Sequence, residues 1–464
     1  MRIVARRDTH EVAIATEAGD LSMEALRAAL VRARSAAVID PRFPGLPKTP
    51  RKLAHGPTDA KAGGLLRADD GALVEAAWRI VGGALDAFTT PTAAAHIIGT
   101  SSPGVVLGGD VSMMRDRMAL ASSNFDDVRA EAGAHFTCTV TALIESLDAK
   151  GTASALGATR SRMRAATARA GRDAVMRALA LGNGERPPGG MYRVVFGPQP
   201  IAELLNYMVI PSLSTGAFHA ASTAYHGRFG AQVMDARLSL LDDPGAARGA
   251  FRRRLTCEGL PARRTIMIRD GRLVGLLSNF YDSHRLATDG HRAEKLGPLS
   301  SDLVSFAPNS GYRLGESAVR RFDANPGTAA TNVILRARGG KSERDLIRAV
   351  GEGIYVGRVW YTYPINGQRA GDFTCTVSGD SYLIRNGMLA APLAPNALRI
   401  NANIEKVFSQ PIGVGDRAKP AMVWGAPEAY YVSSLAAGQI PFAAIESPQD
   451  STAQYSMARS STTE

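Results

Sequence analysis

Two pairs of histidines have a spacing that can serve metal binding. His219 and His226 are seven residues apart, as are His284 and His291. Seven residues is about two helical turns, so both members of a pair can project from one face of a helix. A zinc-peptidase helix also carries a glutamate between its histidines, and none stands here. One interpretation is therefore that His219 and His226 bind a metal. The favoured interpretation is that they are ordinary polar residues of a loop rich in Gly, Ser and Ala.

Other catalytic signatures are missing from the sequence. No serine lies in a G-x-S-x-G elbow, and no G-x-x-x-x-G-K-[ST] phosphate loop occurs. The three cysteines, Cys138, Cys257 and Cys375, are far apart and never form C-x-x-C. This pattern argues against a disulfide framework and against a cysteine-rich zinc site. Each cysteine is better read as a small hydrophobic residue.

Five short segments, in a fixed order, resemble the C-terminal part of the TldD/PmbA family of peptidases and their partner subunits. The family signature reads G-[DE]-F-S, about ten residues, then I-x-N-G, and Thr374 stands in place of the serine. The resemblance covers about 191–415, and the N-terminal third departs from it. The segments are Asp242-Asp243-Pro244, Cys257–Leu260 with Arg263-Arg264 before Asp270-Gly271, Thr331–Leu335, Leu346–Val356, and Gly371–Thr374 followed by Asn386-Gly387.

The resemblance also implies where a metal site would lie. The catalytic subunit of the family binds zinc through H-E-x-x-x-H on a helix, with two His ligands and a Glu general base. Counting back without gaps from 223–233, the motif falls on 206–211. Asn206 and Pro211 stand at the histidine positions and Tyr207 at the glutamate. The third ligand of the family is a C-terminal cysteine, and none follows Cys375.

These departures make the chain similar to the TldE/PmbA branch, which has the fold without the metal ligands. The resemblance implies a heterodimer in which a TldD-like catalytic subunit supplies zinc and the general base. This chain would carry no cofactor and would enclose half of a cavity where unfolded peptides are cleaved. Two alternatives stay open: a stand-alone peptide-binding protein without protease activity, and a self-sufficient metallopeptidase that uses His219 and His226.

The signature stretch is the predicted substrate-binding region. Its residues favour an extended strand, which can bind a peptide strand by main-chain hydrogen bonds. The other interpretation is a structural turn that places Phe373 in the core. The residues predicted to bind substrate are Gly371, Asp372, Phe373, Thr374, Cys375 and Thr376.

The first half of the chain is expected to be rich in helices. Ser22 can cap a helix that begins at Met23, and a second helix is expected from Ala72 to about Leu85. Gly99 to Gly109 is expected to be a linker. In the middle segment, His135 to Val140 has the residue types of a strand, and the arginine-rich stretch from Ser161 to Leu181 is expected to form one exposed helix.

The second half changes character. Strands are expected at 192–196, 359–363 and 373–377, and two-residue hairpin turns at Asp270-Gly271 and Asn386-Gly387. The fold class is therefore α+β, with an α/β N-terminal part and a large β-rich C-terminal domain. The predicted divisions are an N-terminal α+β segment 1–100, a middle α+β segment 101–188, a C-terminal domain 191–440 and a disordered tail 447–464.

Composition bounds the remaining possibilities. The chain has 464 residues and a net charge of +11, and 45% of its residues are hydrophobic. The basic residues are spread along the chain and lack interleaved aromatic residues, so nucleic-acid binding is not expected. No secretory signal precedes the first helix, and no apolar run is long enough to cross a membrane. These features are typical of a cytoplasmic protein.

Overall fold

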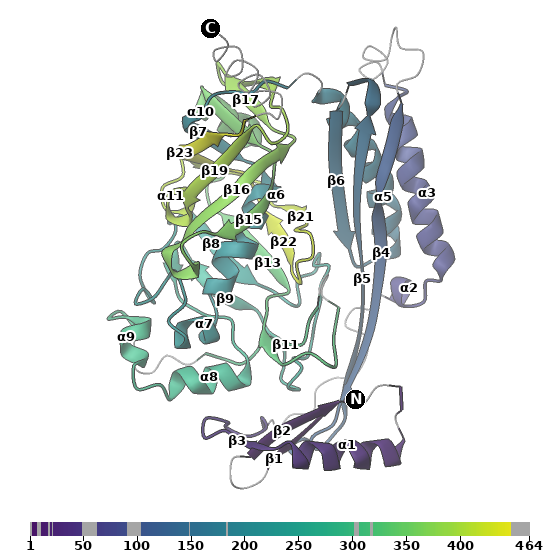
Figure 1. The fold of residues 1–464 in the computed structure, drawn as a ribbon, viewed down its shortest axis with the longest axis vertical. Coiled ribbons are helices and arrows are strands. Elements are labelled where there is room, and N and C mark those ends of the chain that lie inside the picture. Colours follow the sequence, from purple (N-terminus) through teal and green to yellow (C-terminus); the bar gives the residue numbers. More distant parts are fainter. Residues whose placement is uncertain are drawn as a thin grey trace, which may run out of the picture.

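The computed structural model describes residues 2–6, 11–16, 19–20, 22–48, 63–90, 104–147, 149–181, 184–300, 306–315 and 319–446. In these ranges the predicted α+β fold class is confirmed, because helices pack against sheets in every part of the molecule (Figure 1). The predicted tail 447–464 lies outside the described residues. None of the helices in the described ranges combines the length and apolar character that a bilayer crossing requires.

A small unit lies at the N-terminal end of the chain (Figure 1). Its antiparallel sheet has the order β1-β2-β3 and is covered by helix α1. Small residues of the sheet, Ala13 and Ala15, form a buried cluster with Ala29 and Ala33 of the helix. The predicted helix start is confirmed, since the hydroxyl of Ser22 accepts a hydrogen bond from the backbone N–H of Ala25. The elements are β1 (Arg2–Arg6), β2 (Glu11–Thr16), α1 (Met23–Ser35) and β3 (Val38–Ile39).

A second unit is a three-stranded antiparallel sheet with two long helices on its outer face (Figure 1). Strands β4 and β5 pair along their full lengths, from Val105 opposite Ile144 to Leu120 opposite Arg129. The predicted linker is wrong at its C-terminal end, because Gly108 and Gly109 pair within β4. The elements are α2 (Gly63–Leu66), α3 (Asp70–Ala87), β4 (Val105–Leu120), β5 (Arg129–Ile144), η2 (Glu145–Leu147), β6 (Ala149–Gly157) and α5 (Arg160–Ala180).

Helix α5 is the predicted arginine-rich helix, and only one of its faces is exposed. Arg164, Arg169 and Arg172 face solvent, whereas Ala170 and Ala174 are buried against α3 and the sheet. The prediction of an exposed helix is therefore correct for the arginine face alone. Helices α2 and α3, which fall in the predicted segment 1–100, pack here and not on the small N-terminal sheet. The predicted division of the chain into domains stays a prediction.

The C-terminal unit contains two large sheets that share one hydrophobic core. The nine-stranded sheet has the order β15-β16-β19-β23-β7-β14-β17-β18, with β20 paired to β23. Its strands are β7 (Gly190–Phe196), β14 (Gly353–Val356), β15 (Arg358–Pro364), β16 (Asp372–Gly379), β17 (Tyr382–Arg385), β18 (Met388–Pro392), β19 (Leu398–Asn403), β20 (Gly413–Val414) and β23 (Leu435–Ala444).

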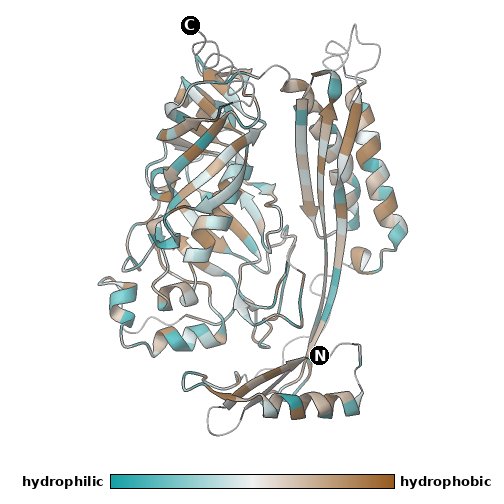
Figure 2. Cartoon of the chain, viewed as in Figure 1, coloured by the Kyte–Doolittle hydropathy of each residue, from teal (hydrophilic) through white to brown (hydrophobic). Residues whose placement is uncertain are grey.

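The second sheet has six strands in the order β10-β9-β8-β13-β22-β21. Hydrophobic residues run along the strands of both sheets (Figure 2), and members of each, such as Val194 and Leu240, meet in the same buried cluster. The strands are β8 (Leu238–Asp242), β9 (Thr265–Arg269), β10 (Arg272–Leu273), β13 (Asn332–Ala337), β21 (Lys419–Ala421) and β22 (Ala429–Val432). A separate short pair is β11 (Gly311–Tyr312) with β12 (Gly327–Thr328).

Short helices and two tight turns complete this unit. Both predicted hairpin turns are confirmed, because Asp270, Gly271, Asn386 and Gly387 all have positive φ, as a two-residue type I′ turn requires. The helices are α6 (Pro198–Leu204), α7 (Thr215–His219), α8 (Phe280–Ala287), α9 (Arg292–Leu296), α10 (Glu343–Val350), α11 (Ile404–Phe408) and the short turn η6 (Gln368–Ala370).

A charged cluster connects the long hairpin β4–β5 to the C-terminal unit. Arg320 pairs with both Asp116 of β4 and Glu131 of β5. The second oxygen of Glu131 accepts the backbone N–H of Arg254 at 2.7 Å. Next to these ion pairs, the ring of His135 lies 4.4 Å from that of Phe251. The hairpin is therefore held by ion pairs and by ring packing together.

Adjacent glycines in α3 give a matched test of the helix contact. A Cβ on Gly83 would lie 1.9 Å from the carbonyl oxygen of Ala168, whereas a Cβ on Gly82 would meet nothing within 4 Å. We expect Gly83→Ala to destabilise the protein by about 1–3 kcal/mol through overpacking. Gly82→Ala should stabilise it by up to about 1 kcal/mol through helix propensity. Thermal unfolding of both variants checks this, and equal shifts in the two would contradict the predicted close packing.

Candidate functional site

The residues at the predicted lost-ligand positions follow helix α6 in a change of helix type. Regular α-helix ends at Leu204, and the chain continues as a π-helical turn η3 (Leu205–Val209) and a 3-10 turn η4 (Ile210–Ser212). Pro211 lies near the start of η4, where a missing N–H costs nothing. The predicted break of the helix at Pro211 is therefore wrong in position, because regular α-helix ends at Leu204 and Pro211 lies within the 3-10 turn. Single π-helical turns are frequent at functional sites.

Side chains from distant segments hold this turn in place. The hydroxyl of Tyr430 donates a hydrogen bond of 2.9 Å to the amide oxygen of Asn206. The amide of Gln368 donates to the Met208 carbonyl at 2.5 Å and to the Ser212 hydroxyl at 3.1 Å. The Met208 carbonyl also accepts a hydrogen bond of 3.0 Å from the Ser212 hydroxyl. Asn206 is thus fixed inside the protein, and its neighbour Tyr207 remains 36% exposed.

A buried carboxyl group connects α6 to strand β15. Glu203 is 7% exposed and accepts a hydrogen bond of 2.9 Å from the amide of Gln199. The same amide contacts both backbone groups of Val359 in β15, at 3.0 Å to its N–H and 3.1 Å to its carbonyl. Burial raises the pKa of Glu203 to about 7, and nearby Arg358 and Gln199 offset only part of that increase. Burial therefore favours the protonated form of Glu203 well above the pH at which an exposed glutamate ionises.

Two more buried carboxyl groups lie behind the turn. Asp242 accepts three hydrogen bonds, from the backbone N–H groups of Thr331 and Asn332 and from the Thr331 hydroxyl, at 2.7 to 2.9 Å. Burial nevertheless raises its pKa to about 7. Burial, together with the charge of Asp242, raises the pKa of Glu428 to about 8. The site is thus backed by carboxyl groups that hold their protons near neutral pH.

Strand β15 forms the outer edge of the nine-stranded sheet and carries exposed aromatic residues. Trp360 and Tyr361 are 47% and 67% exposed, and their ring centroids are 4.5 Å apart. A β-bulge inserts one extra residue between Trp360 and Tyr363, and Tyr361 in this bulge has a φ of 52°. Positive φ is unfavourable for a bulky residue, so the bulge holds the ring outward at a cost.

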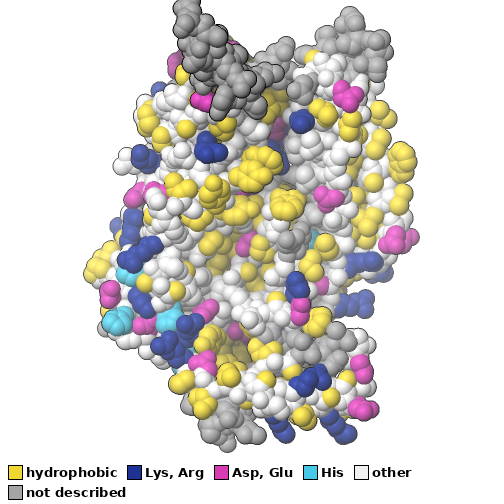
Figure 3. Space-filling model, in the orientation of Figure 1, with side chains coloured by type: hydrophobic (Ala, Val, Ile, Leu, Met, Phe, Trp, Pro, Cys, Tyr) yellow, Lys and Arg dark blue, Asp and Glu magenta, His cyan; other side chains and the backbone are white. Residues whose placement is uncertain are grey.

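Strand β15 lies on the side of the C-terminal unit that turns toward the three-stranded sheet (Figure 1). Figure 3 shows a group of large hydrophobic side chains near the middle of the drawn face, over the region of α6, β15 and β21 in Figure 1. Tyr207 of η3 and the aromatic residues of β15 belong to elements that contact each other. The turn η3 and strand β15 are therefore neighbours, and we call their exposed rings together the aromatic surface.

Strand β16 contains most of the predicted substrate-binding stretch, and the structure corrects how it can act. It pairs with β15 on one side and with β19 on the other, so its main-chain groups are already used. A peptide strand has no free edge to join here, and the predicted main-chain mode of binding is wrong for this strand. Sequence patterns do not give strand order, which made the error possible.

The side chains of this stretch point mainly to the interior. Phe373 is fully buried in the core, as the structural interpretation predicted. Thr374 donates a hydrogen bond of 2.7 Å to Asn401, and burial raises the pKa of the Cys375 thiol well above its usual range. Thr376 is 9% exposed, opposite Trp360 in the edge strand. A role of these residues in substrate binding stays a prediction.

Gly371 and Asp372 form the turn that enters β16. Gly371 has a φ of 72° and lines a small cleft beside Arg228 and Glu405. The carboxylate of Asp372 accepts hydrogen bonds of 2.9 Å from both Asn366 and Asn403. These bonds lower the pKa of Asp372. The aspartate therefore fixes the turn.

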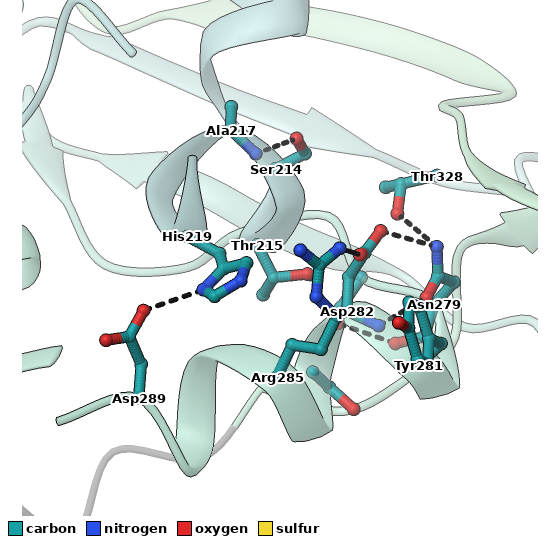
Figure 4. Close-up of polar contacts among 12 residues, drawn as sticks. Ser214, Thr215, Ala217, His219, Asn279, Tyr281, Asp282, Arg285, Asp289 and Thr328 are labelled. Atoms are coloured by element: carbon teal, nitrogen blue, oxygen red, sulfur yellow. Dashed lines mark hydrogen bonds and ion pairs between the residues drawn. The ribbon is translucent and has the colours of Figure 1, made fainter. Parts of the chain in front are cut away.

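The candidate ligand His219 ends the short helix α7, and its ring is already engaged. Its Nδ1 lies 2.7 Å from a carboxylate oxygen of Asp289 (Figure 4). The same carboxylate oxygen also pairs with Lys295 at 2.6 Å. Burial acts to raise the pKa of Asp289, but hydrogen bonds from Lys295, His291 and His219 hold it well below its usual range. His226 lies in the turn that follows, outside this group. The local structure of His219 is a helix end and not the loop expected.

Comparison with known proteins identifies the fold and the family. The family model described as the PmbA/TldA metallopeptidase C-terminal domain matches residues 189–441, which is more than half of the chain. The chain belongs to the TldD/PmbA family. No curated protein matches the chain in sequence. The predicted family membership is thereby confirmed.

Solved structures extend the TldD/PmbA likeness to nearly the whole chain. TldE from Thermococcus kodakarensis superposes with a TM-score of 0.73 at 17% identity, over 95% of this chain and 89% of that one. A proposed modulator of DNA gyrase from Bacteroides thetaiotaomicron gives 0.70 at 15% identity, over 96% and 88%. A similar protein from Thermotoga maritima gives 0.69 at 15%, over 95% and 88%. At these identities the likeness shows the fold alone.

The TldD/PmbA resemblance implies zinc, and the residues at the motif positions do not fit it. Zinc takes His, Cys or carboxylate ligands, whereas Asn206, Tyr207 and Pro211 supply none. Within the described ranges, no group of three His, Cys, Asp or Glu side chains converges as a metal site would need. That this chain binds no zinc stays a prediction.

Sequence reasoning missed the groups that surround the turn. Glu203 and Tyr430 are far apart in the chain and match no motif. Asp242 belongs to the Asp242-Asp243-Pro244 segment that supported the resemblance, which was the available signal. The bulge at Tyr361 contains no residue typical of turns, so nothing in the sequence indicated it.

Glu203 gives a pH-dependent test of the site. Its folded pKa of about 7 exceeds its ordinary 4.5, so its contribution to stability is complete below about pH 4.5 and is lost as pH rises through 7. We expect Glu203→Gln to raise the free energy of unfolding at pH 8, by an amount on the order of 3 kcal/mol at most, and to change it little at pH 5.

The exposed Glu294→Gln is the matched control, because its side chain is 71% exposed. Thermal unfolding at both pH values measures the difference. A Glu203→Gln variant that gains nothing on going from pH 5 to pH 8 would contradict a protonated, buried Glu203.

Proposed function

We propose that this chain is a TldE/PmbA-like subunit of a heterodimeric metallopeptidase that processes or degrades unfolded peptides. The observation that carries the proposal is the set Asn206, Tyr207 and Pro211 at the positions of H-E-x-x-x-H. A metal-dependent cleavage would then need a second subunit that supplies the zinc and the general base. A homologue that carries the motif is the partner we propose.

Strand β15 would supply this chain's half of the substrate cavity. An edge strand has main-chain groups free for a peptide strand, and such binding tolerates varied side chains. The side chain of Gln199 occupies the edge at Val359, so the segment from Tyr361 to Tyr363 is the part that would bind the peptide. The exposed Trp360 and Tyr361 would cover apolar side chains of the peptide.

The stretch from Gly371 to Thr376 has a supporting place in this proposal. Strand β16, which holds most of this stretch, pairs with β15 in the sheet, and its Thr376 lies opposite Trp360. A stand-alone peptide-binding protein would use the same edge without any partner. A self-sufficient peptidase would need His219 as a ligand together with further ligands, and no group of three His, Cys, Asp or Glu side chains converges in the part of the chain that the structure describes.

A cleavage assay separates these three functions. We expect no hydrolysis of an unfolded peptide by the chain alone, and chelator-sensitive hydrolysis when the motif-bearing homologue is added. Tyr361→Gly should lower that hydrolysis about tenfold or more, because it removes the exposed ring from the peptide path. The same change should leave stability equal or higher, since glycine adopts positive φ without strain.

Trp78→Ala is the control, because Trp78 is 69% exposed on α3, away from this edge. Chelator-sensitive hydrolysis by this chain alone would contradict the role of a partner subunit. Undiminished hydrolysis by the pair with Tyr361→Gly would contradict peptide binding at the edge strand β15. It would not contradict the proposed heterodimer.

A further inference from the structure

A second hollow lies on the six-stranded sheet, apart from the aromatic surface. It has a volume of about 460 Å³ and crosses strands β9, β8 and β13 with their connecting turns. This volume is in the range that small ligands and short peptide segments occupy. The residues that line it are Arg237, Ser239, Leu241, Ile266, Arg269, Asp270, Arg336, Ala337 and Arg338.

The floor of this hollow is apolar and has no free main-chain edge. Leu241 of β8 pairs with Ile266 of β9 on one side and with Ile334 of β13 on the other. All three strands are interior to the sheet, so their backbone groups are used. A ligand must therefore be recognised by side chains, with an apolar group against Leu241 and Ile266.

The rim of the hollow carries an excess of positive charge. Four arginines line the hollow, and two of them have a carboxylate partner. Arg237 binds Asp235 at 2.7 Å, and Arg338 lies 3.8 Å from Asp270. Arg269 and Arg336 are exposed, and no carboxylate pairs with either among the described residues. Exposed guanidinium groups beside an apolar floor are well suited to carboxylates that flank an apolar side chain.

We propose that this hollow, which we name the arginine groove, binds an acidic peptide segment with an apolar residue between its carboxylates. Arg269 and Arg336 would each hold one carboxylate, and the apolar residue would lie on Leu241 and Ile266. Nucleic acid fits less well, because no aromatic residue lines the groove for stacking. The proposal does not depend on the peptidase function.

Fluorescence anisotropy with a labelled synthetic peptide tests the groove directly. The probe has a leucine between two pairs of glutamates, and its control has glutamines in their place. We expect the full chain to bind the glutamate probe and not the glutamine control. Arg269→Glu and Arg336→Glu should each weaken binding about tenfold.

Arg172→Glu is the matched control, because Arg172 is an exposed arginine on α5 and the substitution changes the net charge equally. It should leave binding unchanged, and far-UV circular dichroism should show all three variants folded. Equal weakening by all three variants would reveal non-specific charge attraction and overturn the proposal. A short DNA duplex that binds more tightly than the peptide and depends on the same two arginines would overturn it in favour of nucleic acid.

Discussion

The C-terminal unit depends on two buried polar side chains, Asp242 and Asn332, at the junction of β8 and β13. The carboxyl of Asp242 accepts three hydrogen bonds from Thr331 and Asn332. The amide of Asn332 donates to the carbonyls of Asp243 and Phe251 and accepts the Phe251 N–H at 3.1 Å. Buried polar groups are costly unless they are hydrogen-bonded, so the bonds of Asp242 Oδ1 and of Asn332 favour one relative position of the strands and the loop. The second oxygen of Asp242 has no hydrogen-bond partner among the described residues.

The consequences reach both parts of the molecule. On the side of the site, strand β22 pairs in parallel with β13. This pairing places Tyr430 where its hydroxyl donates a hydrogen bond to Asn206. Toward the long hairpin, the loop held by Asn332 presents Phe251 to His135, and Arg320 then pairs with Asp116 and Glu131. One polar junction thus aligns the turn at 206–211 with the three-stranded sheet opposite.

Local features were predictable from the sequence because their causes are local. The cap at Ser22 and the Asp270-Gly271 turn each depend on a few neighbouring residues. The interior position of β16 was not predictable, because it follows from pairing with strands distant in sequence. The same holds for Glu203, whose raised pKa arises from burial that no short pattern encodes. The resemblance gave the family correctly, and a shared fold does not itself confer chemistry.

The central claim is that this chain has the TldD/PmbA fold and that the catalytic metal is bound by a partner subunit. Native mass spectrometry with elemental analysis tests it most directly, on the chain alone and mixed with a homologue that carries H-E-x-x-x-H. Our account predicts no stoichiometric zinc in the dialysed chain, and a one-to-one complex that holds zinc in the homologue. About one zinc per chain in the isolated protein would contradict it and would return attention to His219 and His226.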